Sequence, residues 1–258
     1  MPDLPSAAAR LGVPLTPAQL ELFRRYTAHL LEANRRINLT ALRDEDALIL
    51  RYHLDAIALL PLIARTAGLA PDELRRQAWS AVDVGSGGGA PAIPLAIAWP
   101  SLRYALIESI AKKARFLNEV AQSLNLPLTI FNARAEEIGR SAAHREHYDL
   151  VTARAVAALP ALAELTLPLI RVGGLAVYPK GPRVDDEVEA ARYAIHLLGG
   201  QLLGVEEVTV PGLKETRLAV LVRKIAPTPP SYPRRPGLPA KRPLLRSTHA
   251  KNDEPFSR

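Results

Sequence analysis

The chain has 258 residues, of which 48% are hydrophobic and 23% charged, as expected for one sizeable globular domain with an appendage. It has no cysteine, which excludes disulfides, zinc–thiolate sites and cysteine nucleophiles. Its net charge of +7 arises within residues 223–258. We expect a cytoplasmic protein without a secretory signal or a membrane span.

The N-terminal part is predicted to be helical. Residues 1–14 are rich in proline and alanine, so we expect them to be loosely ordered. Thr16-Pro17-Ala18-Gln19 has the pattern of a capping box with proline at the first helical position. A second helix is expected from Asp46 to Leu60, ending at Pro61. We therefore predict a helical segment over residues 15–68, packed beside the main domain.

The middle of the chain alternates strand-like and helix-like segments. The predicted strands are Ala81–Val84, Tyr104–Ile107, Leu128–Phe131, Leu150–Thr152, Leu175–Val177, Val205–Val210 and Leu218–Val222, and the helices lie near 91–99, 110–124, 157–170 and 184–198. This order predicts an α/β, Rossmann-like domain over residues 78–225, with a seven-stranded, mostly parallel sheet and helices on both faces. The short link between the last two strands favours an antiparallel hairpin, an ending typical of class I methyltransferases.

Residues 226–258 form a separate, basic tail. They contain eight prolines, a density that disfavours both helix and sheet. We expect this tail to be extended and close to the surface.

The most informative motif is the glycine-rich run that follows the first predicted strand, Asp83-Val84-Gly85-Ser86-Gly87-Gly88-Gly89. A strand, a glycine turn and a helix start together present free backbone N–H groups to a ligand. Glu108 ends the next strand, where a carboxylate can accept hydrogen bonds from ribose hydroxyls. Residues 132–137 follow the third strand, where an adenine would lie. The pattern predicts a nucleoside-bearing cofactor.

Three interpretations of this motif stay open on the residues alone. The run Gly85–Ala90 fits the GxGxxA fingerprint of a nicotinamide-dependent, NAD-binding oxidoreductase. Asp83 favours a cofactor with a cationic amino-acid group, and Pro91 and Pro94 remove N–H donors that a pyrophosphate would need. S-adenosylmethionine is therefore favoured over NAD. The third possibility is a non-catalytic RNA-binding factor with an inactive pocket.

The chain also resembles the bacterial small-subunit ribosomal RNA guanine-N7 methyltransferase family, RsmG, also called GidB. The matching segments span about residues 16–245. They are Asn38-Leu39-Thr40, His53-Leu54-Asp55-Ala56, the glycine-rich run, Ile93-Pro94-Leu95-Ala96, Ile107-Glu108-Ser109 with Lys112-Lys113, Thr152-Ala153-Arg154-Ala155, Pro179-Lys180-Gly181 and Tyr232-Pro233-Arg234-Arg235-Pro236-Gly237.

The resemblance implies an S-adenosylmethionine-dependent enzyme that methylates 16S ribosomal RNA, free or within a small-subunit assembly intermediate. It places cofactor contacts on Gly85, Ala90, Ala135, Glu136 and Arg154, to which the strand-end pattern adds Asp83, Gly87 and Glu108. Two residues depart from the family pattern: Ala90 stands where Phe or Leu is usual, and Ala92 where Gly is usual. Neither change removes a polar contact, so we expect activity to survive.

The chemistry implied for guanine N7 needs alignment more than acid–base catalysis. N7 carries an in-plane lone pair and no proton, so no base is required. The catalytic residue is left open, with Arg154 and Asp55 as candidates. No metal is expected, because His144 and His147 lie in a charged loop without further ligands.

The basic tail and nearby cations suggest a polyanionic partner. We predict RNA contacts at Lys112, Lys180, Arg234 and Arg235. Because the deep groove of A-form RNA is closed to side chains, the target guanine should lie in an exposed or single-stranded region. We expect the protein to act as a monomer.

Overall fold

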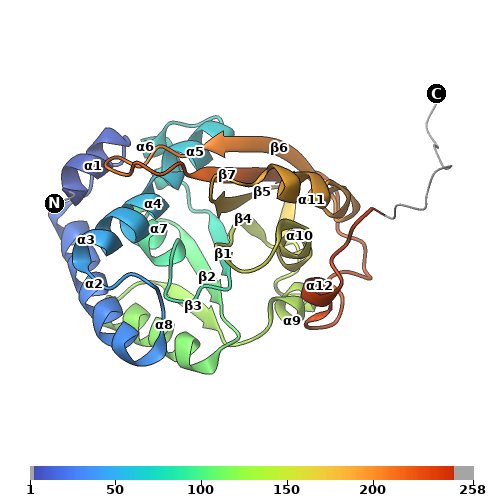
Figure 1. Ribbon diagram of the computed structural model, residues 1–258, viewed down its shortest axis with the longest axis horizontal. Helices are drawn as coiled ribbons and strands as arrows, with labels where there is room; N and C mark the ends of the chain where they lie inside the picture. Colours follow the sequence, from blue (N-terminus) through green and yellow to red (C-terminus); the bar gives the residue numbers. More distant parts are fainter. Residues whose placement is uncertain (1–2, 247–258) are drawn as a thin grey trace.

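The computed structural model describes residues 3–246, and its centre is a seven-stranded sheet in the order β3-β2-β1-β4-β5-β7-β6 (Figure 1). The strands are β1 Ser80–Val84, β2 Arg103–Ile107, β3 Leu128–Phe131, β4 Tyr148–Thr152, β5 Ile170–Lys180, β6 Gly200–Glu207 and β7 Leu218–Lys224. β1 to β5 pair in parallel, whereas β7 runs antiparallel to both β5 and β6. The predicted seven-stranded sheet and its closing hairpin are confirmed, although β6 begins earlier than expected.

Helices cover both faces of the sheet (Figure 1). They are α1 Leu4–Arg10, α2 Pro17–Ile37, α3 Glu45–Leu48, the π-helix Ile49–Leu54, α4 Asp55–Ile57, α5 Leu59–Thr66, α6 Pro71–Arg76, α7 Ala92–Ala98, α8 Ala111–Ser123, α9 Ala135–Arg140, α10 Leu159–Thr166, the 3-10 helix Leu167–Leu169, α11 Asp185–Leu197 and α12 Leu238–Lys241. Strand side chains alternate between two cores, so that Ala81 packs with α1 to α8 and Val82 packs with α9 to α11.

The N-terminal helices share the core of the sheet rather than forming a core of their own. The predicted capping box is confirmed, because Gln19 N donates to Thr16 Oγ1 (3.2 Å) and Thr16 N donates to Gln19 Oε1 (2.9 Å). The expectation of a loose N-terminus is wrong: α1 forms there, and it buries Leu4 and neighbouring alanines against this core. Burial of apolar side chains outweighs the local bias of a proline- and alanine-rich sequence.

Pro61 does not end a helix, contrary to the prediction. It lies in the first turn of α5, where a helix needs no N–H from its residues, so proline is tolerated. The continuous stretch Glu45–Thr66 is long and apolar enough to cross a membrane, but 72% of its most apolar window is buried inside the molecule. A helix that packs into the core of a folded domain has the same composition.

The tail also differs from the prediction. It is not simply extended: α12 forms at Leu238–Lys241, with Pro239 in its first turn, and the segment lies against α9 and α10 (Figure 1). The proline count was a poor guide because proline is compatible with the first turn of a helix. Residues 247–258 of the predicted tail lie outside the described residues.

Candidate functional site

The glycine-rich turn leaves β1 at the carboxyl edge of the sheet and is fixed by neighbouring elements. Gly85 N donates to the carbonyl oxygen of Ile107 at the end of β2 (2.8 Å). Gly85 has φ +71°, and a Cβ atom there would lie 2.6 Å from Val156 Cγ2, so any other residue would be strained and would displace Val156. On the opposite side, the buried hydroxyl of Tyr26 donates to the carbonyl oxygen of Gly88 (2.6 Å). The turn is therefore a rigid, closely packed element.

Asp83 is the last but one residue of β1, two positions before Gly85, and is 1% exposed. Its Oδ1 accepts a hydrogen bond from Thr152 Oγ1 (2.6 Å), which links the ends of β1 and β4. Burial raises the pKa of Asp83 to about 6, although the hydrogen bonds from Thr152 and Ser86 oppose that rise. A positively charged ligand group beside Asp83 would favour its ionised form.

Glu108 is the second buried carboxylate, 5% exposed, at the end of β2. Its Oε2 accepts from Gly87 N (2.9 Å) and its Oε1 from Ile110 N (2.7 Å). The two N–H groups hold the carboxylate at the edge of the glycine turn, and each oxygen keeps a lone pair that can accept a further hydrogen bond. The contribution of Gly87 is thus to hold the Glu108 carboxylate in place through its N–H group.

A cleft of about 160 Å³ opens beside these residues, between the ends of the first three strands and α9. It is lined by Val84, Gly85, Ile107, Ser109, Ala133, Arg134, Ala135, Glu136, Val156, Ala157, Leu165, Gly237 and Ala240. Predicted residues Gly85, Ala135 and Glu136 come together here. Ala90 lines neither this cleft nor the second cavity described next, and is 8% exposed in the core.

The second cavity, of about 450 Å³, lies on the other side of the segment that follows β4. It is lined by Thr40, Leu42, Arg51, Tyr52, Asp55, Arg154, Ala155, Pro179, Lys180, Gly181 and Arg217. Asp55 accepts from Arg154 Nη1 and from Arg217 Nε, both at 3.1 Å, and the Arg154 guanidinium lies 4.9 Å from the centre of the Tyr52 ring. Both candidate catalytic residues therefore lie in this cavity, although Arg154 was predicted to contact the cofactor.

The segment after β4 contributes to both spaces, and Ala155 within it lines the cavity. Ala155 has φ +56°, the left-handed conformation that side chains other than glycine rarely adopt. Arg154 before it lines the cavity, whereas Val156 after it lines the cleft. One turn of the chain thus supplies a charged group to one space and an apolar wall to the other.

Comparison with known proteins decides the family. A family model described as "GidB: rRNA small subunit methyltransferase G" matches residues 19–217. The chain belongs to this family. It is 46% identical over 246 residues to the ribosomal RNA small subunit methyltransferase G of Roseiflexus castenholzii, covering 95% of this chain and 100% of that protein. It is 43% identical to the corresponding protein of Deinococcus radiodurans, covering 91% and 89% of the two chains.

Solved structures agree on the fold. A putative O-methyltransferase from Klebsiella pneumoniae aligns with a TM-score of 0.51 and 18% identity, over 83% of this chain and 92% of that one. Membership of the family makes the protein an S-adenosylmethionine-dependent methyltransferase, which confirms the resemblance and decides against the nicotinamide alternative. Glu136, which is 4% exposed, and an apolar wall line the cleft, as such a cofactor needs. The predicted residues Asp83, Gly87 and Glu108 do not line it, although their chain neighbours Val84, Ile107 and Ser109 do.

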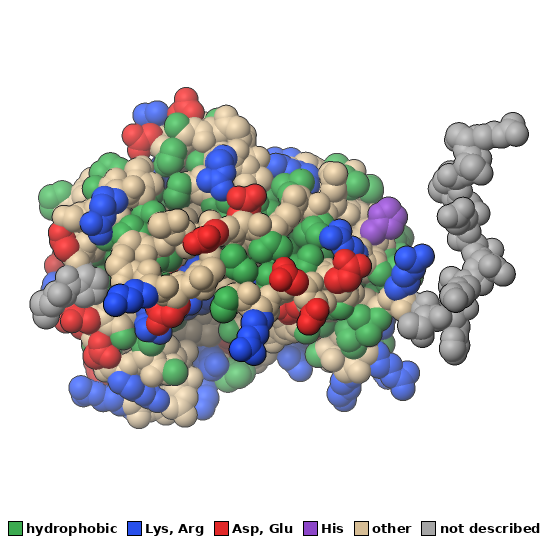
Figure 2. All heavy atoms as spheres, turned by 45° about the horizontal axis from the view of Figure 1, so that its top comes forward, with side chains coloured by type: hydrophobic (Ala, Val, Ile, Leu, Met, Phe, Trp, Pro, Cys, Tyr) green, Lys and Arg blue, Asp and Glu red, His purple; other side chains and the backbone are tan. Residues whose placement is uncertain are grey.

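The predicted RNA-binding residues lie in different surroundings. Lys112 lines a groove between α2 and α8 together with Arg36 and Arg115, whereas Lys180 is paired with Glu187 (2.7 Å) at the second cavity. Figure 2 shows acidic and basic side chains interspersed over most of the visible face, with Lys and Arg prevailing along its lower edge. The structure does not bring these four residues into one patch.

The two tail arginines differ from each other. Arg235 is exposed, but Arg234 forms an ion pair with the fully buried Glu164 (2.6 Å). The charge of Arg234 is thus already satisfied inside the protein.

Two of the histidines named from the sequence contact neighbouring hydroxyl groups. His53 is buried, its Nε2 lies 2.7 Å from Thr27 Oγ1, and burial lowers its pKa to about 3. His144 Nδ1 lies 3.0 Å from the hydroxyl of Tyr148. Within residues 3–246, no three His, Cys, Asp or Glu side chains gather as a metal site would require.

Several residues that line the two spaces were not predicted as site residues, among them Tyr52, Arg217, Gly237 and Ala240. Tyr52 directly precedes the matching segment His53-Leu54-Asp55-Ala56, so proximity was an available signal. The other three reach the site from distant parts of the chain. Gly237 ends the matching segment Tyr232–Gly237, whereas no local pattern marks Arg217 or Ala240.

Proposed function

We propose that the protein transfers the methyl group of S-adenosylmethionine to N7 of one guanine in 16S ribosomal RNA. The observation that carries the proposal is the pair of spaces that neighbouring residues line, Arg154 and Ala155 in the cavity and Val156 and Ala157 in the cleft. One is a cleft with mainly small or apolar walls and the buried carboxylate of Glu136, and the other is a wider cavity lined by cations. A cationic nucleoside suits the first, and an RNA base with its phosphates suits the second.

The cofactor is assigned to the cleft. Glu108 would accept hydrogen bonds from the ribose hydroxyls, and Asp83 would hold the cationic amino-acid end. Gly85, Ala135 and Glu136 would surround the nucleoside. When bound, S-adenosylmethionine supplies a methyl group attached to a positively charged sulfur.

The target base is assigned to the cavity. Guanine N7 already carries its lone pair in the ring plane, so these residues need only orient the base and exclude water. Arg154, held by Asp55 and lying over Tyr52, is suited to fix the base or a flanking phosphate at the border of the two spaces. Lys180 would contact the RNA backbone from the rim.

The same division suggests roles for the three segments of the chain. Residues 78–225 would bind the cofactor, residues 15–68 would cover the glycine turn and supply Tyr52 and Asp55, and the tail would flank the cleft. We infer a cytoplasmic enzyme that acts as a monomer on the small subunit or its RNA.

Transfer of a tritiated methyl group tests the proposal. Small subunits and protein-free 16S RNA, both from cells that lack this activity, serve as substrates, and the modified base is mapped by cleavage at N7-methylguanine. We expect incorporation at a single guanine, falling steeply as salt rises because phosphate contacts are lost. Incorporation at another atom, or none with a cofactor-bound protein, would refute the proposed reaction.

A further inference from the structure

The tail reaches the cofactor cleft although the family model ends before it. That model matches residues 19–217, whereas Gly237 and Ala240 line the cleft together with Ala135 and Glu136. The tail therefore contributes to a space whose other walls belong to the sheet domain. Two separate anchors hold it there.

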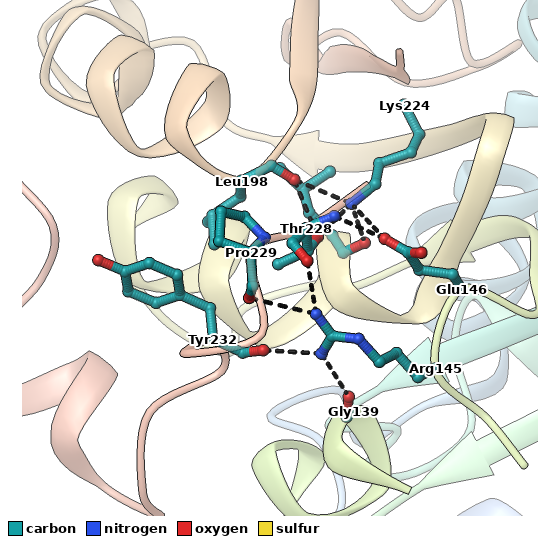
Figure 3. A network of polar contacts seen from close by, with 9 residues as sticks. Gly139, Arg145, Glu146, Leu198, Lys224, Thr228, Pro229 and Tyr232 are labelled. Carbon is teal, nitrogen blue, oxygen red and sulfur yellow. Dashed lines mark hydrogen bonds and ion pairs between the residues drawn. The ribbon is translucent and has the colours of Figure 1, made fainter. Parts of the chain in front are cut away.

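The first anchor lies at the start of the tail (Figure 3). Arg145, in the loop between α9 and β4, donates to the carbonyl oxygens of Tyr232 and Thr228, both at 2.7 Å, and of Gly139 at 3.2 Å. Glu146 beside it accepts from Thr228 N at 2.6 Å. Figure 3 shows the Arg145 guanidinium pointing into the turn of the tail, where it binds several carbonyl groups at once.

Buried Lys224 completes this anchor. Its ammonium donates to the carbonyl oxygens of Leu198 (2.8 Å) and Leu167 (3.0 Å) and to the hydroxyl of Thr228, and it lies 3.5 Å from Glu146. A buried charge with this many partners fixes the position of the chain that supplies them. Residues 228–232 are thus held firmly against the end of β7.

The second anchor lies between the first and the cleft. Glu164 on α10 has no exposed surface, and it accepts from the backbone N of Arg234 (2.7 Å) and from its Nε (2.9 Å) and Nη2 (2.6 Å). Loss of the Arg234 side chain alone would leave this buried carboxylate without its charged partner, at considerable cost. Three residues further on, Gly237 N donates to Glu136 Oε1 (2.7 Å) at the cleft itself.

We propose that residues 237–240 form a wall of the cofactor site, and that Glu164 and Arg234 are positioning residues for cofactor binding. This inference rests on the proposed function, which assigns the cleft to the cofactor. Gly237 has φ +80° and fixes Glu136 through its N–H, while Ala240 presents a small apolar group. The tail thus borders the nucleoside of the cofactor, and Arg234 holds the tail in place rather than binding RNA.

Binding of S-adenosylhomocysteine, measured by calorimetry on the full chain without RNA, tests the inference. Ala240→Leu adds bulk to an exposed position that lines the cleft, so it should raise Kd at least about tenfold with the melting temperature unchanged. Lys241→Ala is the matched control. It removes a positive charge from the neighbouring exposed residue, which does not line the cleft, and should leave Kd unchanged.

A second variant tests the anchor. Glu164→Gln keeps the shape of the side chain but weakens its hold on Arg234. It should raise the KM for the cofactor severalfold while kcat at saturating cofactor stays near that of the wild type. A change confined to kcat, or to the KM for RNA, would contradict a positioning role.

The outcomes separate the two proposals. If the wild-type protein fails to bind S-adenosylhomocysteine, the assignment of the cleft to the cofactor fails. If the wild type binds but Ala240→Leu binds equally well or more tightly, the assignment of the cleft survives and the tail is not part of it. An equal loss in Lys241→Ala would also overturn the inference, because charge and not the wall would then matter.

Discussion

Neighbouring residues after β4 line the cleft and the cavity, yet the two spaces are built in opposite ways. The cleft is lined mainly by small or apolar residues at or just after the ends of β1, β2, β3 and β4, and Glu136 is the one carboxylate among the described residues that line it. The cavity is lined by long side chains, among them Arg51, Arg154, Lys180 and Arg217 around Asp55. One space is defined by backbone geometry, the other by a charge network.

This difference follows from what each space has to recognise. A cofactor of fixed shape is held best by rigid walls that lose no entropy on binding. An RNA segment presents phosphates at variable positions, which long cationic side chains can follow. Substitutions in the cleft should therefore change cofactor affinity, and substitutions in the cavity should change transfer to RNA.

The largest effect is expected for Arg154→Ala. The substitution removes a guanidinium that pairs with the partly buried Asp55 and lies over Tyr52. Loss of a charged, hydrogen-bonded group at the border of the two spaces should lower methyl transfer at least about a hundredfold. Methyl incorporation into small subunits at saturating cofactor measures this directly.

A cofactor titration of the same variant shows to which space Arg154 belongs. If the residue acts in the cavity, the Kd for S-adenosylhomocysteine should change little. A parallel loss of cofactor affinity would move Arg154 to the cleft and contradict the division drawn above. Arg192→Ala, which removes an exposed arginine of α11, is the control and should leave both quantities unchanged.

The second effect concerns the cleft. Glu108→Gln keeps the side-chain shape but replaces a carboxylate that holds Gly87 N and Ile110 N. The weaker acceptor should raise the Kd of S-adenosylhomocysteine about tenfold, or roughly 1.4 kcal/mol. Glu119→Gln, on the exposed side of α8, makes the same chemical change away from the cleft. Equal affinities in the two variants would show that Glu108 only caps the backbone.

The cleft could be predicted from the sequence because its parts are local. The glycine turn, Asp83 and Glu108 each follow a strand at a fixed offset, and a parallel sheet brings strand ends to one edge. The capping box of α2 was predictable for the same reason, since its two hydrogen bonds join Thr16 and Gln19, three residues apart.

The rest depended on contacts between distant residues. Arg217 reaches Asp55 across 162 positions, and Gly237 reaches Glu136 across 101. The tail was expected to be extended because its composition opposes regular structure, but burial of Glu164 beside Arg234 decides its path. Local sequence does not encode which buried carboxylate an arginine will meet.

The third prediction uses the pH dependence of Asp83. Burial raises the pKa of Asp83 from 3.8 to about 6, so the folded protein takes up a proton between those values that the unfolded chain does not. The stabilisation from this proton is complete below about pH 4 and is lost as pH rises through 6. Asp83→Asn should therefore gain stability relative to the wild type over that range, by about 3 kcal/mol at most.

Cofactor binding should show the opposite trend. A cationic ligand favours the ionised carboxylate, so the affinity for S-adenosylmethionine should rise about fivefold between pH 5 and pH 7 in the wild type. Asp83→Asn should flatten that rise. Calorimetric titrations at three pH values, paired with denaturant unfolding, measure both trends. A wild-type affinity independent of pH would mean that the cationic end of the cofactor lies away from Asp83.

The smallest effect is expected where the N-terminal helices touch the glycine turn. Tyr26→Phe removes only the hydroxyl that donates to the carbonyl oxygen of Gly88 (2.6 Å) and leaves the ring packed in the core. A buried carbonyl group without its partner should cost about 1–3 kcal/mol of unfolding free energy. Because the carbonyl belongs to the back of the turn and not to the cleft, cofactor affinity should fall only about twofold. Tyr193→Phe, at a tyrosine of α11 that is 42% exposed, controls for the loss of a hydroxyl. A large loss of cofactor affinity in Tyr26→Phe alone would show that the N-terminal helices set the shape of the turn, so that the cleft depends on more than the walls that line it.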